Sequence, residues 1–250
     1  MAANKEDKKH TNKESIDDST APVEAAAMKI IARIHTGFTT KFGVPRQSGL
    51  VEALKGKIIF EPEYRNAEAL RGLEEFSHLW LIWQFSEAVR DNWSPTVRPP
   101  RLGGNKRIGV FATRSPFRPN ALGLSCVRLE SIDLHTPLGP VINVSGIDMM
   151  DNTPIFDIKP YIPYADCKTE AQGGFVEKLE NKELQVEFPK EMLSQIPKEH
   201  REAILGALAE DPRPSYQKDP ERIYGLSFAG FDVRFTVRDR LLSVCQVIKL

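Results

Sequence analysis

Short apolar runs, separated by glycine, proline and polar turn residues, dominate the chain from residue 28 to about residue 147. These runs occupy residues 29–35, 57–60, 77–85, 108–113, 124–132 and 141–147. Each has the length of a strand. Between them, residues 66–73 carry a helix pattern, with Asn66 as the expected N-cap and Gly72 near the stop. Closely spaced strands with short turns predict a mainly β fold, in which an antiparallel sheet closes into a β-barrel.

The pattern changes after residues 161–174, which are expected to form a loop. Beyond this loop the predicted elements are a strand at 184–188, a helix at 198–210 and strands at 228–237 and 240–249. The helix is predicted because Ile204, Leu205 and Leu208 recur at helical spacing. We therefore expect a barrel domain over residues 28–168 and a small C-terminal α+β domain over residues 180–250.

Residues 1–27 are mostly Lys, Asp, Glu, Ser, Thr and Ala, with no aromatic side chain. Such a segment buries too little apolar surface to offset the entropy lost on ordering, so a disordered tail is predicted. It lacks the apolar core of a secretory signal, and the chain has no run of eighteen apolar residues that would predict a membrane helix. The cysteines at positions 126, 167 and 245 are too far apart to favour a disulfide framework or a zinc site. A cytoplasmic protein without a metal is expected.

The charged residues are balanced overall but unevenly distributed. The chain has 34 basic and 34 acidic residues, which is unlike a basic protein that coats nucleic acid. Between Asn92 and Leu129, however, no Asp or Glu occurs. The basic residues of that segment are Arg98, Arg101, Lys106, Arg107, Arg114, Arg118 and Arg128. Such a block favours an anionic partner, unless acids from elsewhere in the fold pair with these side chains.

Common catalytic and nucleotide-binding signatures are absent from the sequence. There is no G-x-G-x-x-G or G-x-x-x-x-G-K-[ST] phosphate loop, no H-E-x-x-H or paired C-x-x-C metal motif and no G-x-S-x-G nucleophile. Instead, residues 112–120 (ATRSPFRPN) form a polar segment between two apolar runs. Two prolines fix its backbone, so it can hold Arg114, Arg118 and Asn120 in place for a ligand. The alternative is a stiff connector whose arginines bind nearby carbonyl groups.

Several motifs in one order give the chain a likeness to a known family. Residues 97–120 have the sequence VRPPRLGGNKRIGVFATRSPFRPN. The accompanying motifs are FGVPRQ at residues 42–47, LEEFSHLW at 73–80, DIKPY at 157–161 and DPRPSY at 211–216. Together they resemble the TrmO (TsaA-like) family, from about Met28 to the C-terminus.

The resemblance implies a TsaA-like β-barrel that binds S-adenosylmethionine without a Rossmann fold and works as a homodimer. It also implies methylation of N6 of threonylcarbamoyladenosine at position 37 of threonine tRNA. Carried over by motif, the cofactor-binding residues are Pro45, Arg46, Gln47, Ser86, Glu87, Arg114, Leu124, Asp157, Ile158, Lys159 and Pro160. The chain departs from the bacterial pattern at Ser86 and Glu87, where bacterial members carry His and Gln.

These residue types suit the carboxylate, ammonium, adenine and sulfonium groups of the cofactor. Arg46 or Arg114 could hold the carboxylate, and Asp157 or Glu87 the ammonium. Methyl transfer mainly requires that donor and acceptor are aligned, but the N6 lone pair is delocalised into the purine and the carbamoyl group. Asp157 is therefore a candidate base, and Arg118 a candidate for stabilising charge on the carbamoyl oxygen. A cap or turn residue is the alternative for Asp157.

The C-terminal motif offers candidate contacts to RNA. We expect Asp211, Arg213 and Tyr216 to contact tRNA, with Arg213 on phosphate and Tyr216 stacked on a base. A structural turn is the alternative for this motif. His78, which lies in an apolar run, is expected to be a hydrogen-bonded core histidine and not a catalytic base.

Two other functions are compatible with these residues. A β-barrel that binds RNA or a nucleotide without catalysis would keep the basic block but have little affinity for S-adenosylmethionine. A hydrolase of a small anionic substrate would use Asp157 and the arginines, but without a recognisable nucleophile or metal cluster. Cofactor binding separates the methyltransferase from both.

Overall fold

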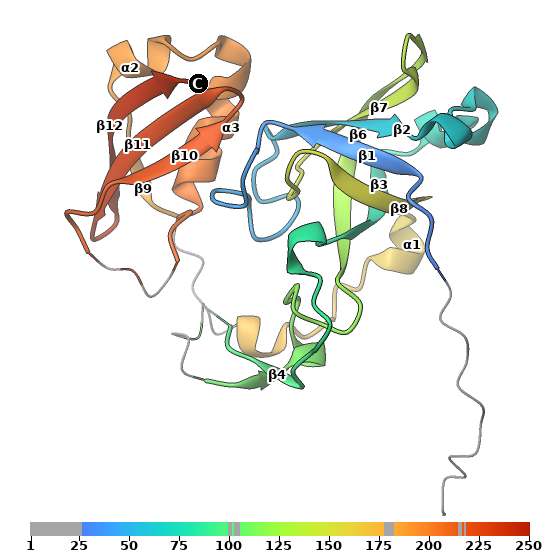
Figure 1. Ribbon diagram of the computed structural model, residues 1–250, viewed down its shortest axis with the longest axis horizontal. Helices are drawn as coiled ribbons and strands as arrows, with labels where there is room; N and C mark the ends of the chain where they lie inside the picture. Colours follow the sequence, from blue (N-terminus) through green and yellow to red (C-terminus); the bar gives the residue numbers. More distant parts are fainter. Residues whose placement is uncertain (1–26, 100–101, 103–105, 178–182, 215–216, 218) are drawn as a thin grey trace, which may run out of the picture.

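The computed structural model describes residues 27–99, 102, 106–177, 183–214, 217 and 219–250. Two predictions from the sequence fall mainly or wholly outside this part of the chain. One is the disordered tail over residues 1–27, of which Ala27 is described, and the other is the tRNA contact by Tyr216. In Figure 1 the barrel and the C-terminal sheet lie beside each other, joined by the loops between them.

A closed antiparallel barrel makes up the first part of the molecule (Figure 1). Within the described residues its strands are β1 (Ala32–Thr36), β2 (Lys55–Phe60), β3 (His78–Gln84), β6 (Leu122–Thr136), β7 (Gly139–Ser145) and β8 (Thr153–Pro160), in the order β1-β2-β7-β6-β3-β8. Side chains alternate between core and exterior along β3, where Leu79, Leu81 and Trp83 are buried. The predicted mainly β fold with an antiparallel barrel is therefore confirmed.

Two strands of the barrel domain differ from the prediction. The apolar pattern does not predict β8, because prolines and charged residues interrupt it. Barrel closure nevertheless pairs β8 on both sides, and a β-bulge against β3 accommodates its irregularity. The strand predicted at 108–113 is wrong beyond Gly109. There, β5 (Ile108–Gly109) pairs with β4 (Thr96–Val97) and leads into the 3-10 helix η6 (Val110–Ala112).

The C-terminal domain combines a sheet with two helices. In the described residues the sheet has the order β10-β11-β12-β9, with β9 (Gln185–Glu187), β10 (Tyr224–Phe228), β11 (Phe231–Arg238) and β12 (Leu241–Lys249). The helices are α2 (Lys190–Ser194) and α3 (Lys198–Ala209). Ile204 and Leu208 of α3 are fully buried, as their helical spacing predicts. The strand predicted at 228–237 is wrong at its start, because Ala229 and Gly230 adopt positive φ and form the β10–β11 turn.

Short helices fill the connections of the barrel domain. They are η1 (Pro62–Tyr64), η2 (Ala67–Leu70), η3 (Leu73–Glu75), η4 (Ser86–Ala88), α1 (Pro163–Asp166) and η7 (Gly174–Val176). The helix predicted at 66–73 is a pair of 3-10 turns, because Gly72 at φ +85° starts a new turn. Asn66 is an N-cap, since its side chain accepts a hydrogen bond of 3.0 Å from the Glu68 N–H. Among the described residues, no helix is long and apolar enough to cross a membrane.

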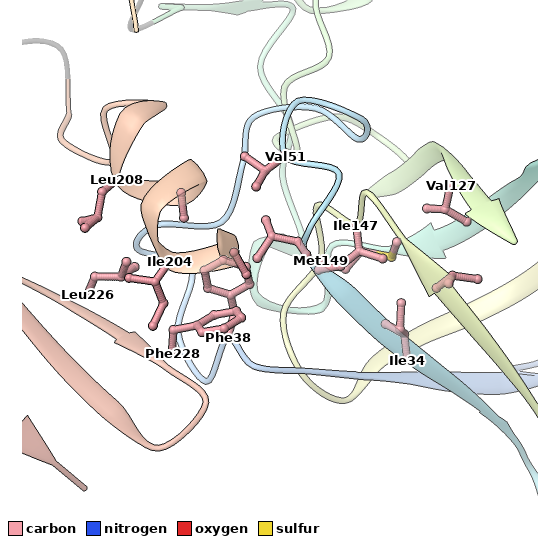
Figure 2. Packing of buried hydrophobic residues seen from close by; sticks show 14 of the residues in the cluster. Ile34, Phe38, Val51, Val127, Ile147, Met149, Ile204, Leu208, Leu226 and Phe228 are labelled. Atoms are coloured by element: carbon pink, nitrogen blue, oxygen red, sulfur yellow. The ribbon is translucent and has the colours of Figure 1, made fainter. Parts of the chain in front are cut away.

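The β1–β2 loop (residues 37–54) is packed between the barrel and the C-terminal domain. Phe38, which is fully buried, meets Phe228 edge to face, with ring centroids 4.8 Å apart (Figure 2). The Ala229 main-chain N–H donates to the Gly37 carbonyl at 2.8 Å. One continuous core includes buried residues from both parts of the molecule. The loop is therefore fixed by the C-terminal domain as well as by the barrel.

Two glycines allow the β1–β2 loop and the C-terminal domain to lie close together. Gly43 has φ +91°, and a Cβ atom there would lie 1.9 Å from Leu226 Cδ1. At Gly206, in α3, a Cβ atom would lie 2.5 Å from Val51 Cγ1 of the β1–β2 loop. A larger residue at either position would push the loop away from the C-terminal domain.

Phe38→Ala should lower the free energy of unfolding by about 3–5 kcal/mol, because it leaves a cavity where the two domains meet. Urea denaturation followed by circular dichroism measures this change. Ile223→Ala, which removes an apolar side chain that is 61% exposed, is the control and should change the free energy by less than about 0.5 kcal/mol. Equal effects of the two substitutions would contradict the importance of the Phe38 packing.

Candidate functional site

A braced polar loop leads into β6. Within the Arg114 loop (residues 113–121), Arg118 Nη1 donates to the Thr113 carbonyl at 3.1 Å, and the Phe117 N–H donates to Ser115 Oγ at 3.2 Å. Arg118 thus binds a nearby carbonyl, as expected of a stiff connector. The Arg114 side chain instead reaches out of the loop.

Arg114 joins this loop to the β1–β2 loop. Its Nη1 donates a hydrogen bond to Gln47 Oε1. Next to Gln47, Ser48 Oγ accepts a hydrogen bond of 3.1 Å from the main-chain N–H of Cys126 in β6. Two of the segments predicted to bind the cofactor, residues 45–47 and Arg114, therefore meet beside β6 although they are far apart in the sequence.

A largely buried carboxylate lies at this junction. Asp148 Oδ1 accepts a hydrogen bond of 2.6 Å from Ser125 Oγ, and Ser125 Oγ accepts one of 2.9 Å from Trp83 Nε1. The Ser48 main-chain N–H also donates to Asp148, and Arg114 is close enough to act on it electrostatically. Burial raises the pKa of Asp148 to about 6, although the hydrogen bonds and Arg114 act in the opposite direction.

Asp148 is a site residue that no sequence motif marks, although it directly follows the strand predicted at 141–147. A charged residue at the end of a buried strand is the signal that could have identified it. Arg114 and Asp148 bring a positive and a negative charge into the same part of the site, with Arg114 exposed and Asp148 largely desolvated. This arrangement suits a zwitterionic group such as the amino-acid end of a ligand.

The predicted residues of β8 lie on a neighbouring part of the barrel surface. Leu124 of β6, Ile82 of β3 and Asp157 of β8 are partners across three adjacent strands, so two strand spacings, about 10 Å, separate Leu124 from Asp157. Asp157 Oδ1 accepts from the Ile158 N–H at 2.9 Å, and its Oδ2 lies 3.0 Å from Lys159 Nζ. Asp157 lies within β8, paired with Ile82, so the alternative of a cap or turn residue is wrong, and its role as a base stays a prediction.

Ser86 and Glu87 lie near the Arg114 loop. Both are exposed in η4, directly after β3. The main-chain N–H of Phe85 donates to the Ala121 carbonyl at 2.8 Å, which ties the start of η4 to the end of the Arg114 loop. The structure therefore places Ser86 and Glu87 directly after a strand end that is tied to the Arg114 loop.

The C-terminal motif faces the β1–β2 loop. The Arg46 guanidinium, next to the buried Pro45, donates to the Asp211 carbonyl at 3.2 Å. The Asp211 carboxylate binds the Arg213 guanidinium through hydrogen bonds of 2.8 and 3.0 Å. Because only 12% of the Arg213 side chain is exposed, this residue stabilises its own loop, as expected of a structural turn. Its contact with phosphate stays a prediction.

His78 lies on the exterior of the barrel and not in its core. Its Nδ1 lies 2.9 Å from Ser77 Oγ, and its ring packs against Tyr161 with centroids 6.2 Å apart. His78 lies outside the core because side chains alternate along β3, and the neighbouring Leu79 is the one that is buried. In the described parts of the chain, no three His, Cys, Asp or Glu side chains are grouped to hold a metal.

Comparisons with known proteins agree over nearly the whole chain. The family model of the tRNA-methyltransferase O N-terminal domain matches residues 33–167, and that of the TrmO C-terminal domain matches residues 181–250. A tRNA (adenine(37)-N6)-methyltransferase of Escherichia coli is 41% identical over 217 residues, which are 84% of this chain and 92% of that protein. RcsF of Pseudomonas aeruginosa, named as a candidate S-adenosylmethionine-dependent methyltransferase, is 41% identical and covers 87% of this chain and 95% of its own.

A solved structure shows the same similarity in three dimensions. The crystal structure of TrmO from Pseudomonas aeruginosa matches with a TM-score of 0.73 and 34% sequence identity. The match covers 91% of this chain and 98% of that one. The likeness therefore includes the C-terminal domain as well as the barrel.

The raised pKa of Asp148 predicts a pH-dependent stability. Since this pKa lies above the ordinary value of 3.8, protonation favours the folded state. The contribution is complete below about pH 4 and is lost as the pH rises through about 6, with a total of about 3 kcal/mol at most. Asp148→Asn does not titrate. The difference in free energy of unfolding, wild type minus Asp148→Asn, should therefore fall over this range in urea titrations.

Asp133→Asn is the matched control for that experiment, because it removes one carboxylate from the exposed β6–β7 hairpin. Its stability difference from the wild type should change less with pH. A constant difference between the wild type and Asp148→Asn from pH 4 to 7 would show that the Asp148 carboxyl is not desolvated in the folded protein.

Proposed function

This chain belongs to the TrmO family, and from that premise we propose that it is an S-adenosylmethionine-dependent tRNA methyltransferase. Its proposed target is N6 of threonylcarbamoyladenosine at position 37 of threonine tRNA. The observation that supports a specific site is the contact of Arg114 with Gln47 near the desolvated carboxylate of Asp148. Cys126, Cys167 and Cys245 are all free, which suits the reducing cytoplasm, where we propose that the protein acts.

The charges beside β6 fit the amino-acid end of S-adenosylmethionine. The Arg114 guanidinium suits its carboxylate, and the neighbouring Asp148 carboxylate suits its ammonium. With a pKa of about 6, Asp148 is mostly ionised at neutral pH. Arg46 is the less suitable partner for the carboxylate, because it already donates to the Asp211 carbonyl. The bound cofactor supplies a methyl group on a positively charged sulfur.

The other residues predicted to bind the cofactor lie around Arg114 and Asp148, some nearer and some farther away. Pro45 lies in the loop that contacts Arg114, and Ser86 and Glu87 lie where η4 meets the Arg114 loop. Leu124 is 56% exposed and offers an apolar surface for the adenine ring. Residues 157–160 of β8 form the more distant part of the proposed set, across β3 from Leu124.

The residues of the chain have two further tasks in the proposed reaction. They hold the methyl donor and N6 in line, which removes much of the entropic cost of the transfer. They also accept the proton of N6 and stabilise the charge that develops on the carbamoyl oxygen. We propose that Arg118, which is held in place by the Thr113 carbonyl, stabilises this charge and that Asp157 accepts the proton.

The anionic substrate suits the basic segment around the Arg114 loop. Threonylcarbamoyladenosine carries a carboxylate in addition to the tRNA phosphates, and anticodon loops already present unstacked bases. Asp211, Arg213 and Tyr216 complete the proposed tRNA surface, with Tyr216 outside the described residues. Arg213 would contribute by holding the loop in shape, given its pairing with Asp211.

Isothermal titration with S-adenosylmethionine tests this proposal. The wild-type protein should bind it with a micromolar-range Kd, about −8 kcal/mol. Arg114→Ala should weaken binding at least about tenfold, because it removes the guanidinium that faces the carboxylate. Arg71→Ala, an exposed arginine paired with Glu68 on η2, is the matched control and should bind as the wild type does.

Two results of the titration would contradict the proposal. Absence of binding to folded wild-type protein would leave a β-barrel that binds RNA or a nucleotide without catalysis as the better account. Unchanged affinity in Arg114→Ala would place the cofactor away from the Arg114 loop.

We also propose that the protein is a homodimer through an exposed apolar patch near the proposed site. The β4–β5 patch consists of Val89, Trp93, Phe111 and Phe117, which are 58%, 53%, 72% and 43% exposed. Trp93 and Phe111 are in contact, with centroids 6.0 Å apart, and Arg90 lies 4.0 Å above the Phe117 ring. Aromatic residues concentrated on a surface favour a protein interface.

Size-exclusion chromatography with light scattering tests the dimer. The wild type should have a mass of about twice 28.2 kDa, and a Trp93→Ser/Phe111→Ser variant should shift towards the monomer because the patch loses its two most prominent rings. Leu138→Ser, at an apolar side chain that is 46% exposed on the distant β6–β7 hairpin, should not shift. A monomeric wild type at micromolar concentration would overturn this part of the proposal.

A further inference from the structure

The Asp211 loop (residues 211–214) holds an unusual backbone conformation. Asp211 has φ +50°, which is uncommon for a residue other than glycine. Two charge-assisted hydrogen bonds from Arg213 bind its carboxylate, and the Arg213 main-chain N–H adds a third of 3.3 Å. With only 28% and 12% of these side chains exposed, the pair is partly shielded from water and geometrically well defined. The loop is therefore a preformed structure and not a flexible connection.

This conformation presents the Asp211 carbonyl to the barrel domain. Arg46 Nη2 donates to that carbonyl at 3.2 Å. The next residue, Gln47, accepts a hydrogen bond from Arg114. A continuous series of contacts thus runs from Arg213 in the C-terminal domain to Arg114 beside Asp148.

Apolar packing fixes the β1–β2 loop on either side of this link. Phe42 stacks on Tyr224 with centroids 6.3 Å apart, and Val51 lies against Gly206. Arg46 itself is exposed, so the segment between these anchors gains order from its polar contact with Asp211. Loss of that contact would loosen the segment around Arg46 and Gln47 on its N-terminal side, while Ser48 stays bound to the Cys126 N–H of β6.

We infer that Arg213 and Asp211 are positioning residues, which hold the Arg46–Gln47 segment of the barrel domain in the place where it supports cofactor binding by Arg114. The role of Arg114 in this inference rests on the proposed function, whereas the link between the two loops does not. The C-terminal domain would then act on the methyl-transfer site as well as on tRNA. Engagement of tRNA and of S-adenosylmethionine would be coupled through the Asp211 loop.

Hydrogen–deuterium exchange of the full chain tests the link without any ligand. Arg213→Ala and Asp211→Asn should both speed exchange in the peptide that covers residues 43–50. Arg234→Ala is the matched control. Arg234 also pairs with an aspartate two residues earlier, Asp232, in the same domain, but it contacts Gln246 of the neighbouring strand and not the barrel. Exchange in residues 43–50 should not change in this control.

Binding and kinetics then separate positioning from direct RNA contact. Arg213→Ala should weaken S-adenosylmethionine binding about five- to tenfold, because Gln47 no longer supports Arg114. The loss of cofactor affinity is the readout that the positioning role requires, because a residue that only shapes the tRNA surface would raise the KM for tRNA and leave S-adenosylmethionine binding unchanged. Arg234→Ala should change neither value.

Three outcomes would overturn the inference or separate it from the proposed function. Unchanged exchange in residues 43–50 of both variants would refute the link. A raised KM for tRNA with unchanged cofactor affinity would show that Arg213 contacts RNA directly. If the wild type binds no S-adenosylmethionine, the proposed function is wrong. Hydrogen–deuterium exchange in residues 43–50 would still test whether the Asp211 loop orders the β1–β2 loop. Should Arg213→Ala not fold, Asp211→Asn carries the test, because asparagine tolerates positive φ.

Discussion

The packing of Phe38 against Phe228 is the interaction on which the arrangement of this protein depends. It fixes the β1–β2 loop, which is polar at its tip, between two folded parts that each have their own sheet. Gly43 and Gly206 permit the close approach, and the core continues across the junction. A loop held from both sides loses little further entropy when it binds a ligand, which is the property that a cofactor site requires.

The same junction supports an electrostatic arrangement that costs stability. Asp148 is desolvated, and its hydrogen bonds from Ser125 and Ser48 and the field of Arg114 offset only part of that cost, as its raised pKa shows. A protein selected for stability alone would place an apolar residue there. A desolvated carboxylate in the field of an arginine is consistent with the proposed ligand, which carries both charges.

The sequence predicted the architecture better than the site. The apolar run at 77–85 and the helical spacing at Ile204 and Leu208 are local signals, and the elements that they predict are present. β8 was not predicted, because its pairing results from closure of the barrel and is not visible in any local sequence pattern. Motif likeness marked Gln47 and Arg114 as candidate binding residues, but their contact, and the place of Asp148 near them, depend on long-range folding. Asp157 shows the converse, because it lies within a motif but makes local contacts in the structure.

The most direct test of the account is transfer of an isotopically labelled methyl group to tRNA, followed by nucleoside digestion and mass spectrometry. The substrate is threonine tRNA that carries threonylcarbamoyladenosine at position 37, and the comparison is the same tRNA with unmodified adenosine. The account predicts one labelled methyl group on threonylcarbamoyladenosine and none on the unmodified tRNA. Label on another nucleoside, or no label from a protein that binds S-adenosylmethionine, would contradict it.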